Sequence, residues 1–170
     1  VRRHTLDTLG AALAGAAQPE PQAAFAAGAA GFGAGGRTVV WGTKHAASPA
    51  LAALVNGTAA HALELDDASG CDHSGAVVVP AVFAALDLPG CSAGEWDVVA
   101  AIVAGYDVGR RVMEASGGYD GHNGAGWHST GTCGTFAAAA AAARVLRCDA
   151  ATTANALGIA GSFASGTWAF

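Results

Sequence analysis

The segment 56–80, NGTAAHALELDDASGCDHSGAVVVP, constrains the fold of this chain more than any other part of it. Glu64, Asp66 and Asp67 lie at its centre, where a predicted helix ends and the helix dipole disfavours negative charge. A fold tolerates such a cluster when the carboxylates are hydrogen-bonded, paired with a cation or used in chemistry. The helix itself is predicted from apolar residues at intervals of three and four, which would form one buried stripe: Leu51, Leu54, Thr58, Ala62 and Leu65.

A short loop joins this acidic cluster to a histidine. Residues 68–72 return His73 towards the acids, and Ser74 opens the next apolar run. Carboxylates and an imidazole would therefore lie between two helices, an arrangement suited to acid–base chemistry. A simpler alternative is that Glu64 and Asp66 only cap a helix or hydrogen-bond the backbone.

Charged residues make up 12% of the chain, about half the usual share, while hydrophobic residues make up 52%. A surface with so little charge predicts that another domain or subunit covers part of it. The net charge of −5 and the lack of a basic run argue against nucleic-acid binding. Apolar runs stay below the ~18–20 residues that span a bilayer, so no membrane segment is expected.

The four cysteines show no CxxC spacing, and no signal peptide is recognised before them. We therefore expect reduced thiols in a cytoplasmic protein. A metal site at Cys71-Asp72-His73, completed by His61, is the alternative, but zinc sites normally show paired ligand spacing. The expectation is a protein with no metal and no other cofactor.

The rest of the chain predicts further helices around small side chains, which allow close approach of helix backbones. A short extended segment is expected at most at 38–41, and the glycine-rich loop 31–36 lacks the ending of a phosphate-binding loop. Residues 116–126 are expected to form a loop with His122 on the surface. Helices are predicted over 1–17, 22–30, 81–86 and 136–145, with others opened by Ser48-Pro49, a capping box at 92–95 and Asp149.

The helix after the capping box is expected to bury a stripe formed by Trp96, Val99, Val103 and Tyr106. Together these elements predict an all-α fold, a compact helical bundle.

A second histidine motif, Trp127-His128-Ser129-Thr130, parallels the first. His73 and His128 each precede a hydroxyl residue and a run of small residues, and helix N-termini attract carboxylates through free N–H groups. Imidazoles titrate near neutral pH and can move protons. The two units facing one pocket would bind a di- or tricarboxylate and exchange a proton beside a carboxylate. The expected catalytic residues are His73, His128, Asp67, Asp66 and Glu64, and the expected substrate-binding residues are Ser74, Gly75, Ser129 and Thr130.

Four segments resemble motifs of the MmgE/PrpD family: DTLGAALAGA, NGTAAHALELDD, HSGAVVVPA and WHSTGTCGTFAAAAAAA. That family includes 2-methylcitrate dehydratase, cis-aconitate decarboxylase and iminodisuccinate epimerase. The resemblance runs through nearly all of the chain but covers only the first part of a family protein. It implies that residues 1–170 form an incomplete helical domain, without the family's smaller α+β domain, and that the domain pairs as a homodimer or with a companion chain.

The resemblance also implies a cofactor-independent hydro-lyase that dehydrates a hydroxy di- or tricarboxylate. Decarboxylase-like members carry a D-x-D-D motif followed by a hydroxyl residue, whereas this chain has Glu64 and Ala68 at those two positions. Dehydration or epimerisation is therefore favoured over decarboxylation. In the resembling enzymes a lysine and other cationic groups come from sequence beyond the point that matches Phe170. An epimerase or decarboxylase of a related dicarboxylate, or a non-catalytic helical module that needs a partner chain, remains as an alternative.

Overall fold

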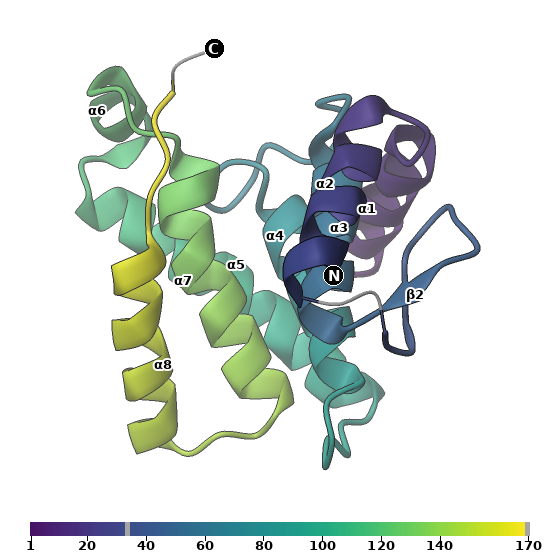
Figure 1. Cartoon of the computed structure of the whole chain (residues 1–170). Helices are drawn as coiled ribbons and strands as arrows, with labels where there is room; N and C mark the ends of the chain where they lie inside the picture. Colours follow the sequence, from purple (N-terminus) through teal and green to yellow (C-terminus); the bar gives the residue numbers. More distant parts are fainter. Residues whose placement is uncertain (33–34, 169–170) are drawn as a thin grey trace.

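The computed structural model describes residues 1–32 and 35–168, so part of the glycine-rich loop predicted at 31–36 lies outside the described residues. Helices dominate the part of the chain that is described, which confirms the all-α class (Figure 1). Eight are present there: α1 (Arg2–Gly15), α2 (Pro19–Phe32), α3 (Pro49–His61), α4 (Ser74–Leu86), α5 (Glu95–Ala115), α6 (Gly118–Gly124), α7 (Ser129–Val145) and α8 (Ala150–Phe163).

A two-stranded hairpin covers one side of α3. Strand β1 (Thr38–Val39) pairs antiparallel with β2 (Ala46–Ala47), as the short extended segment in the sequence predicted. The Asn56 side chain in α3 fastens the hairpin, since it accepts a hydrogen bond from the Trp41 N–H at 2.9 Å and donates one to the Val39 carbonyl at 3.0 Å. The amide is 2% exposed, and these two bonds satisfy it.

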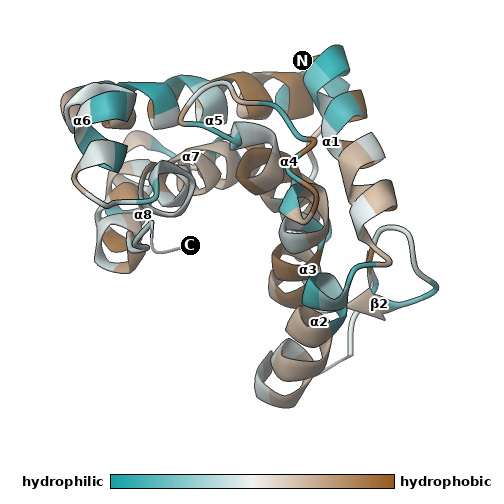
Figure 2. Ribbon diagram, turned by 90° about the horizontal axis from the view of Figure 1, so that it is seen from above, coloured by the Kyte–Doolittle hydropathy of each residue, from teal (hydrophilic) through white to brown (hydrophobic). Residues whose placement is uncertain are grey.

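Helix α4 is the central element of the bundle (Figures 1 and 2). It packs against α3 on one side and against α5 and α7 on the other, while α1 and α2 lie against α3 and α8 lies against α7. Figure 2 shows hydrophobic colouring along α3 and α4, where the core lies. The largest core cluster gathers small and medium side chains of α4, α5 and α7, among them Val78, Val82, Ile102 and Ala137.

Pro80 lies inside α4, and the helix continues through it. Proline has no N–H, so it leaves the carbonyl of Ala76 without its helical partner. Gly57 of α3 faces that carbonyl so closely that a Cβ at position 57 would lie 2.8 Å from its oxygen. The glycine thus lets α3 and α4 cross at a short distance. The helix predicted over 81–86 is confirmed as the last part of α4.

Most of the two apolar stripes expected from periodicity is wrong, although Leu51 is buried as predicted. In α3, Leu54 is 47% exposed, and Leu65 is 63% exposed because the helix ends at His61. In α5, Trp96 is 80% exposed and Val103 53% exposed. The buried residues of both helices include alanine and glycine, which allow close approach: Leu51, Ala52, Val55, Asn56, Ala59 and Ala60 in α3, and Ala101, Ile102, Gly105 and Gly109 in α5.

Several predicted boundaries also need correction. Helix α7 begins at Ser129 rather than at Phe136, because buried Ser, Thr and Gly residues of weak helix propensity are held by packing. Helix α6 occupies part of the segment 116–126 that was expected to be a loop. The cap of α5 is Gly94, whose N–H donates to Asp97 Oδ2 at 3.1 Å. Among the described residues, no helix is both long and apolar enough to cross a membrane.

Two glycines of α1 provide a matched test of the close contact with α3. A Cβ on Gly15 would lie 2.0 Å from the Ala59 carbonyl oxygen, whereas a Cβ on Gly10 would meet nothing within 4 Å. We expect Gly15→Ala to lower the free energy of unfolding by about 1–3 kcal/mol through overpacking. Gly10→Ala should raise it by up to about 1 kcal/mol through helix propensity. Urea unfolding of the full-length gene product measures both, and equal effects of the two substitutions would contradict the packing described here.

Candidate active site

The site begins where α3 ends. The chain leaves the helix after His61 and turns through Glu64, which adopts a left-handed conformation with φ of 49°. A compact loop follows, in which Gly70 forms an isolated bridge with His73. Because the helix stops at His61, the acidic residues fold back beneath its imidazole.

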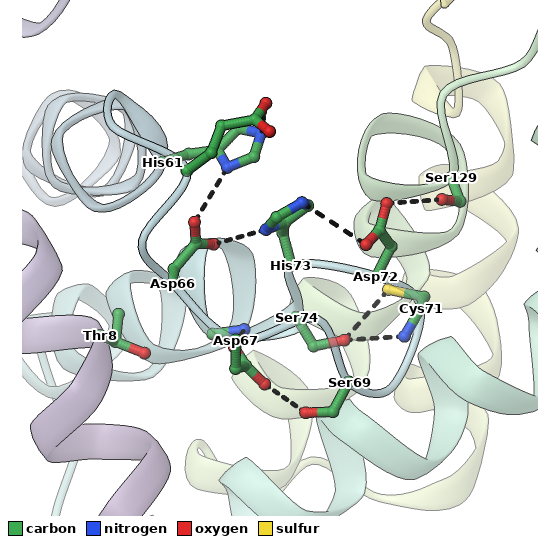
Figure 3. Close-up of polar contacts among 12 residues, drawn as sticks. Thr8, His61, Asp66, Asp67, Ser69, Cys71, Asp72, His73, Ser74 and Ser129 are labelled. Carbon is green, nitrogen blue, oxygen red and sulfur yellow. Dashed lines mark hydrogen bonds and ion pairs between the residues drawn. The ribbon is translucent and has the colours of Figure 1, made fainter.

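Asp66 lies between two imidazoles (Figure 3). Its side chain is 0% exposed, with Oδ1 3.1 Å from His61 Nδ1 and Oδ2 3.2 Å from His73 Nδ1. The first contact is a hydrogen bond, while the second is close without the alignment of one. The two rings lie 4.2 Å apart, so one buried carboxylate orients both histidines.

The Asp66 carboxylate also changes the titration of His61. Its hydrogen bond and its negative charge raise the pKa of His61, although burial of the ring opposes the shift. Since the folded-state pKa lies above the unfolded one, the pairing stabilises the fold below the ordinary pKa of histidine. That stabilisation is lost as the pH rises through the raised value.

His73 occupies the N-cap position of α4 and connects the loop to α7. Its Nε2 lies 3.5 Å from Asp72 Oδ1, and Asp72 Oδ2 accepts a hydrogen bond from Ser129 Oγ at 3.5 Å. The imidazole is thus held between two carboxylates and has 15% of its side chain exposed. His73 and Ser129, which were each predicted to belong to the site, are therefore joined through Asp72 in one polar network (Figure 3).

His128 is the N-cap of α7, and its ring stacks 6.2 Å from that of His61. Burial lowers the pKa of His128, and the neighbouring His61 lowers it further. The pKa values of His61 and His128 are therefore shifted in opposite directions, although the two rings are neighbours. Titratable groups whose pKa values are pushed apart in this way are suited to separate acid and base roles.

Asp67 points to the opposite side of the loop from Asp66. It accepts a hydrogen bond from the Gly75 N–H at 2.9 Å and another from Ser69, and it lies 3.3 Å from His4 Nδ1 of α1. These contacts cap the N-terminus of α4 and fasten it to α1. Burial raises the pKa of Tyr106, and the nearby Asp67 carboxylate raises it further.

The residues predicted to bind substrate differ in whether their polar groups already have hydrogen-bond partners within the protein. The Ser74 hydroxyl accepts a hydrogen bond from the Cys71 N–H at 2.8 Å, and the Gly75 N–H is bonded to Asp67. Thr130 is 6% exposed, and its hydroxyl has no hydrogen-bond partner among the described residues. Of the two helix N-termini, that of α7 therefore offers the clearer anion-binding group.

An open groove of about 660 Å³ lies between α3, α4 and α7. Its walls are mostly small and apolar, and the polar residues that line it are Glu20, Thr58, His61, Thr130 and Thr135. Neither His73 nor His128 lines this groove, which differs from the expectation that both would face a shared cavity. Glu64 is an exposed neighbour of its polar part, with Oε1 3.9 Å from His61 Nε2.

The histidine–aspartate group bears on the expected absence of a metal. One nitrogen each of His61 and His73 and one oxygen of Asp66 lie within 4.8 Å of one another, so they could approach one ion. Each Asp66 oxygen faces a separate imidazole, with a hydrogen bond to His61 and a close contact to His73. Cys71 does not join it: the thiol contacts Ser74, and burial raises its pKa to about 11.

The central place of His61 is what the sequence reasoning missed. A helix continuing through Asp66 would have kept Glu64, at i+3, beside His61 but would have carried Asp66, at i+5, away from it. The available signal was the spacing in HALELDD, with a histidine five residues before a carboxylate that needs a partner. Only the early end of α3 turns that spacing into a contact.

Comparison with known proteins gives a consistent assignment. A family model described as the MmgE/PrpD N-terminal domain matches residues 1–170. The cis-aconitate decarboxylase-like protein oryM of Aspergillus oryzae is 38% identical over 130 residues, covering 71% of this chain and 26% of that protein. Cis-aconitate decarboxylase of Aspergillus terreus is 35% identical over 135 residues, covering 76% of this chain and 27% of that enzyme. The chain thus spans about a quarter of the length of these relatives.

The central role of Asp66 can be tested by titration. We expect Asp66→Asn to lower the pKa of His61, because the hydrogen bond and charge that raise it are lost. Asp67→Asn is the matched control, since Asp67 faces α1 and should leave His61 unchanged. Imidazole ¹⁵N chemical shifts against pH provide the measurement. A His61 pKa that is the same in both variants would refute the arrangement.

The metal-free expectation has its own test. Protein purified without chelator should contain less than stoichiometric zinc, iron and manganese by elemental analysis, and dialysis against EDTA should leave its activity unchanged. Stoichiometric metal that is lost together with activity, and restored with it, would show that His61, Asp66 and His73 hold an ion.

Proposed function

The chain belongs to the MmgE/PrpD family, and from this premise we propose that it carries the proton-transfer groups of a cofactor-independent lyase. The reaction proposed is dehydration of a hydroxy di- or tricarboxylate. One observation supports it most: the His61 and His73 imidazoles flank the buried Asp66 carboxylate, His128 stacks on His61, and the pKa values of His61 and His128 are shifted in opposite directions.

The proposed chemistry assigns one histidine to each proton transfer. His128, whose pKa is lowered, is largely unprotonated at neutral pH and takes the proton from the carbon next to a carboxylate. His73, held between Asp66 and Asp72, gives a proton to the departing hydroxyl group. The C–H and C–O bonds break, a carbon–carbon double bond forms, and the hydroxyl leaves as water.

We assign one substrate carboxylate to the N-terminus of α7. Thr130 supplies a buried hydroxyl with no partner among the described residues, and the first N–H groups of a 17-residue helix carry the positive end of its dipole. The same role is less supported for Ser74 and Gly75, which are bonded within the loop. Ser129 bonds Asp72 and so acts as a positioning residue for His73.

Further cationic groups are needed for a substrate with two or three carboxylates. Among the described residues, no lysine or arginine forms a hydrogen bond or ion pair with His61, His73 or Asp66. In the resembling enzymes such groups, including a lysine, come from sequence beyond the point matching Phe170. We therefore assign activity to the full-length protein, as a homodimer or with a companion chain, and not to residues 1–170 alone.

Decarboxylation is the second candidate, because the two relatives described above are named as cis-aconitate decarboxylase or as similar to it. The same histidines could protonate the carbon that loses carbon dioxide. Against it, Glu64 and Ala68 replace the first acid and the hydroxyl residue of the decarboxylase-like motif. An epimerase would use two of the imidazoles on opposite faces of one carbon, and a non-catalytic module would bind no carboxylate at all.

We expect His128→Asn and His73→Asn in the full-length protein to lower kcat about 10²–10⁴-fold, the usual contribution of a general acid or base. Turnover of 2-methylcitrate, citrate and cis-aconitate, followed by proton NMR of the products, measures the effect and identifies the reaction. His45→Asn is the matched control, because His45 stacks on Phe25 in the hairpin region and lies outside this site.

Two outcomes of the same assay would contradict the proposal. Full activity of His128→Asn would remove the proposed base. A wild-type protein that turns over none of the three acids and binds none of them would favour the non-catalytic module instead.

A further inference from the structure

His61 combines two properties that neither of the other clustered histidines shares. Among the described residues it is the one histidine that lines the groove between α3, α4 and α7. Its Nδ1 is bonded to Asp66, which leaves Nε2 as the nitrogen available to a ligand. The side chain is 25% exposed, whereas the Asp66 carboxylate behind it is 0% exposed. A buried anion thus holds a partly open imidazole at the polar part of the groove.

We propose that His61 is a substrate-binding residue whose Nε2–H donates to a carboxylate of the substrate; this rests on the proposed lyase function. In its protonated form, His61 would be a cationic group of this chain that binds an anionic substrate. The sequence motifs alone had assigned no such group. The substrate class is a di- or tricarboxylate that places one carboxylate in the groove beside His61.

The hydrogen-bonding capacity of imidazole explains why Asp66 matters for this role. With Nδ1–H donated to Asp66, a neutral ring would present Nε2 only as an acceptor, which would repel a carboxylate. The protonated ring donates from both nitrogens. Asp66 raises the pKa of His61 and so favours this form, while a bond from Nε2–H to a carboxylate is a charge-assisted one.

Other charged groups around His61 set its response to pH. Glu64 lies on the exposed side, with Oε1 3.9 Å from Nε2, so a bound carboxylate would have to displace it or lie beside it. Asp72 adds negative charge and raises the pKa of His61, and the neighbouring imidazoles would oppose a second positive charge. The titratable groups that face His61 or line the same groove are Glu20, Glu64, Asp66, Asp72, His73 and His128.

A purely structural role for His61, holding Asp66 in place, gives different expectations. Such a role needs only Nδ1, whereas carboxylate binding needs Nε2. Asparagine can retain a donor near the Nδ1 position, and glutamine can retain one near the Nε2 position. The two substitutions therefore separate the roles, even though both remove the charge.

The test uses tricarballylate, a non-reacting tricarboxylate, and the full-length protein in isothermal titration calorimetry. We expect His61→Asn to raise the Kd for tricarballylate about 10- to 100-fold, and His61→Gln to raise it less. Glu64→Gln should lower the Kd a few-fold in the wild-type background, and this gain should shrink in His61→Asn, because the two groups interact through the bound anion. Circular dichroism and thermal unfolding check that each variant is folded.

A second measurement uses the wild-type protein and needs no substitution. In wild-type protein with ¹⁵N-labelled histidine, saturating tricarballylate should raise the pKa of His61, and the Kd should increase as the pH rises through that value. An unchanged His61 pKa, a smaller loss in His61→Asn than in His61→Gln, or binding that appears only when a divalent metal is added would each overturn the proposal. Loss of turnover with intact tricarballylate binding would instead count against the lyase function alone.

Discussion

The buried carboxylate of Asp66 is the interaction on which the site depends. An ionised group with a fully buried side chain is costly unless it is paired and hydrogen-bonded. The His61 and His73 imidazoles are the groups placed to offset that cost, and they come from opposite ends of the same loop. The carboxylate therefore connects the end of α3 to the beginning of α4, and it orients the groups proposed for substrate binding and proton transfer.

Close helix packing places this loop. Gly15 allows α1 to approach the Ala59 carbonyl of α3, and Gly57 allows α3 to approach the Ala76 carbonyl that Pro80 leaves without a helical partner. Both contacts lie near the two helix ends that hold the histidines. Asp67 then fastens the start of α4 to His4 of α1. The two adjacent acids thus have different roles. Asp66 orients the two imidazoles, while Asp67 connects α4 to α1.

The sequence predicted the fold class, the helix over 81–86 and the position of His73 and His128 just before helices, because these follow from composition, local motifs and the family resemblance. It did not predict which faces are buried. In α3 and α5 the contacts use alanine and glycine, whose hydropathy is too weak to mark a stripe, and Leu54 and Trp96 remain exposed. The role of His61 was missed because its contact with Asp66 forms only where α3 ends early, and the periodicity of apolar residues did not mark that end.

Proton transfer beside a carboxylate is the central claim, and isotope incorporation tests it most directly. The full-length protein would be incubated in D₂O with cis-aconitate, and the products analysed by proton NMR and mass spectrometry. The account predicts that each product molecule gains one carbon-bound deuterium, on the carbon next to a carboxylate and with a single stereochemistry. Product that forms without carbon-bound deuterium, or with deuterium on both faces of that carbon, would contradict it.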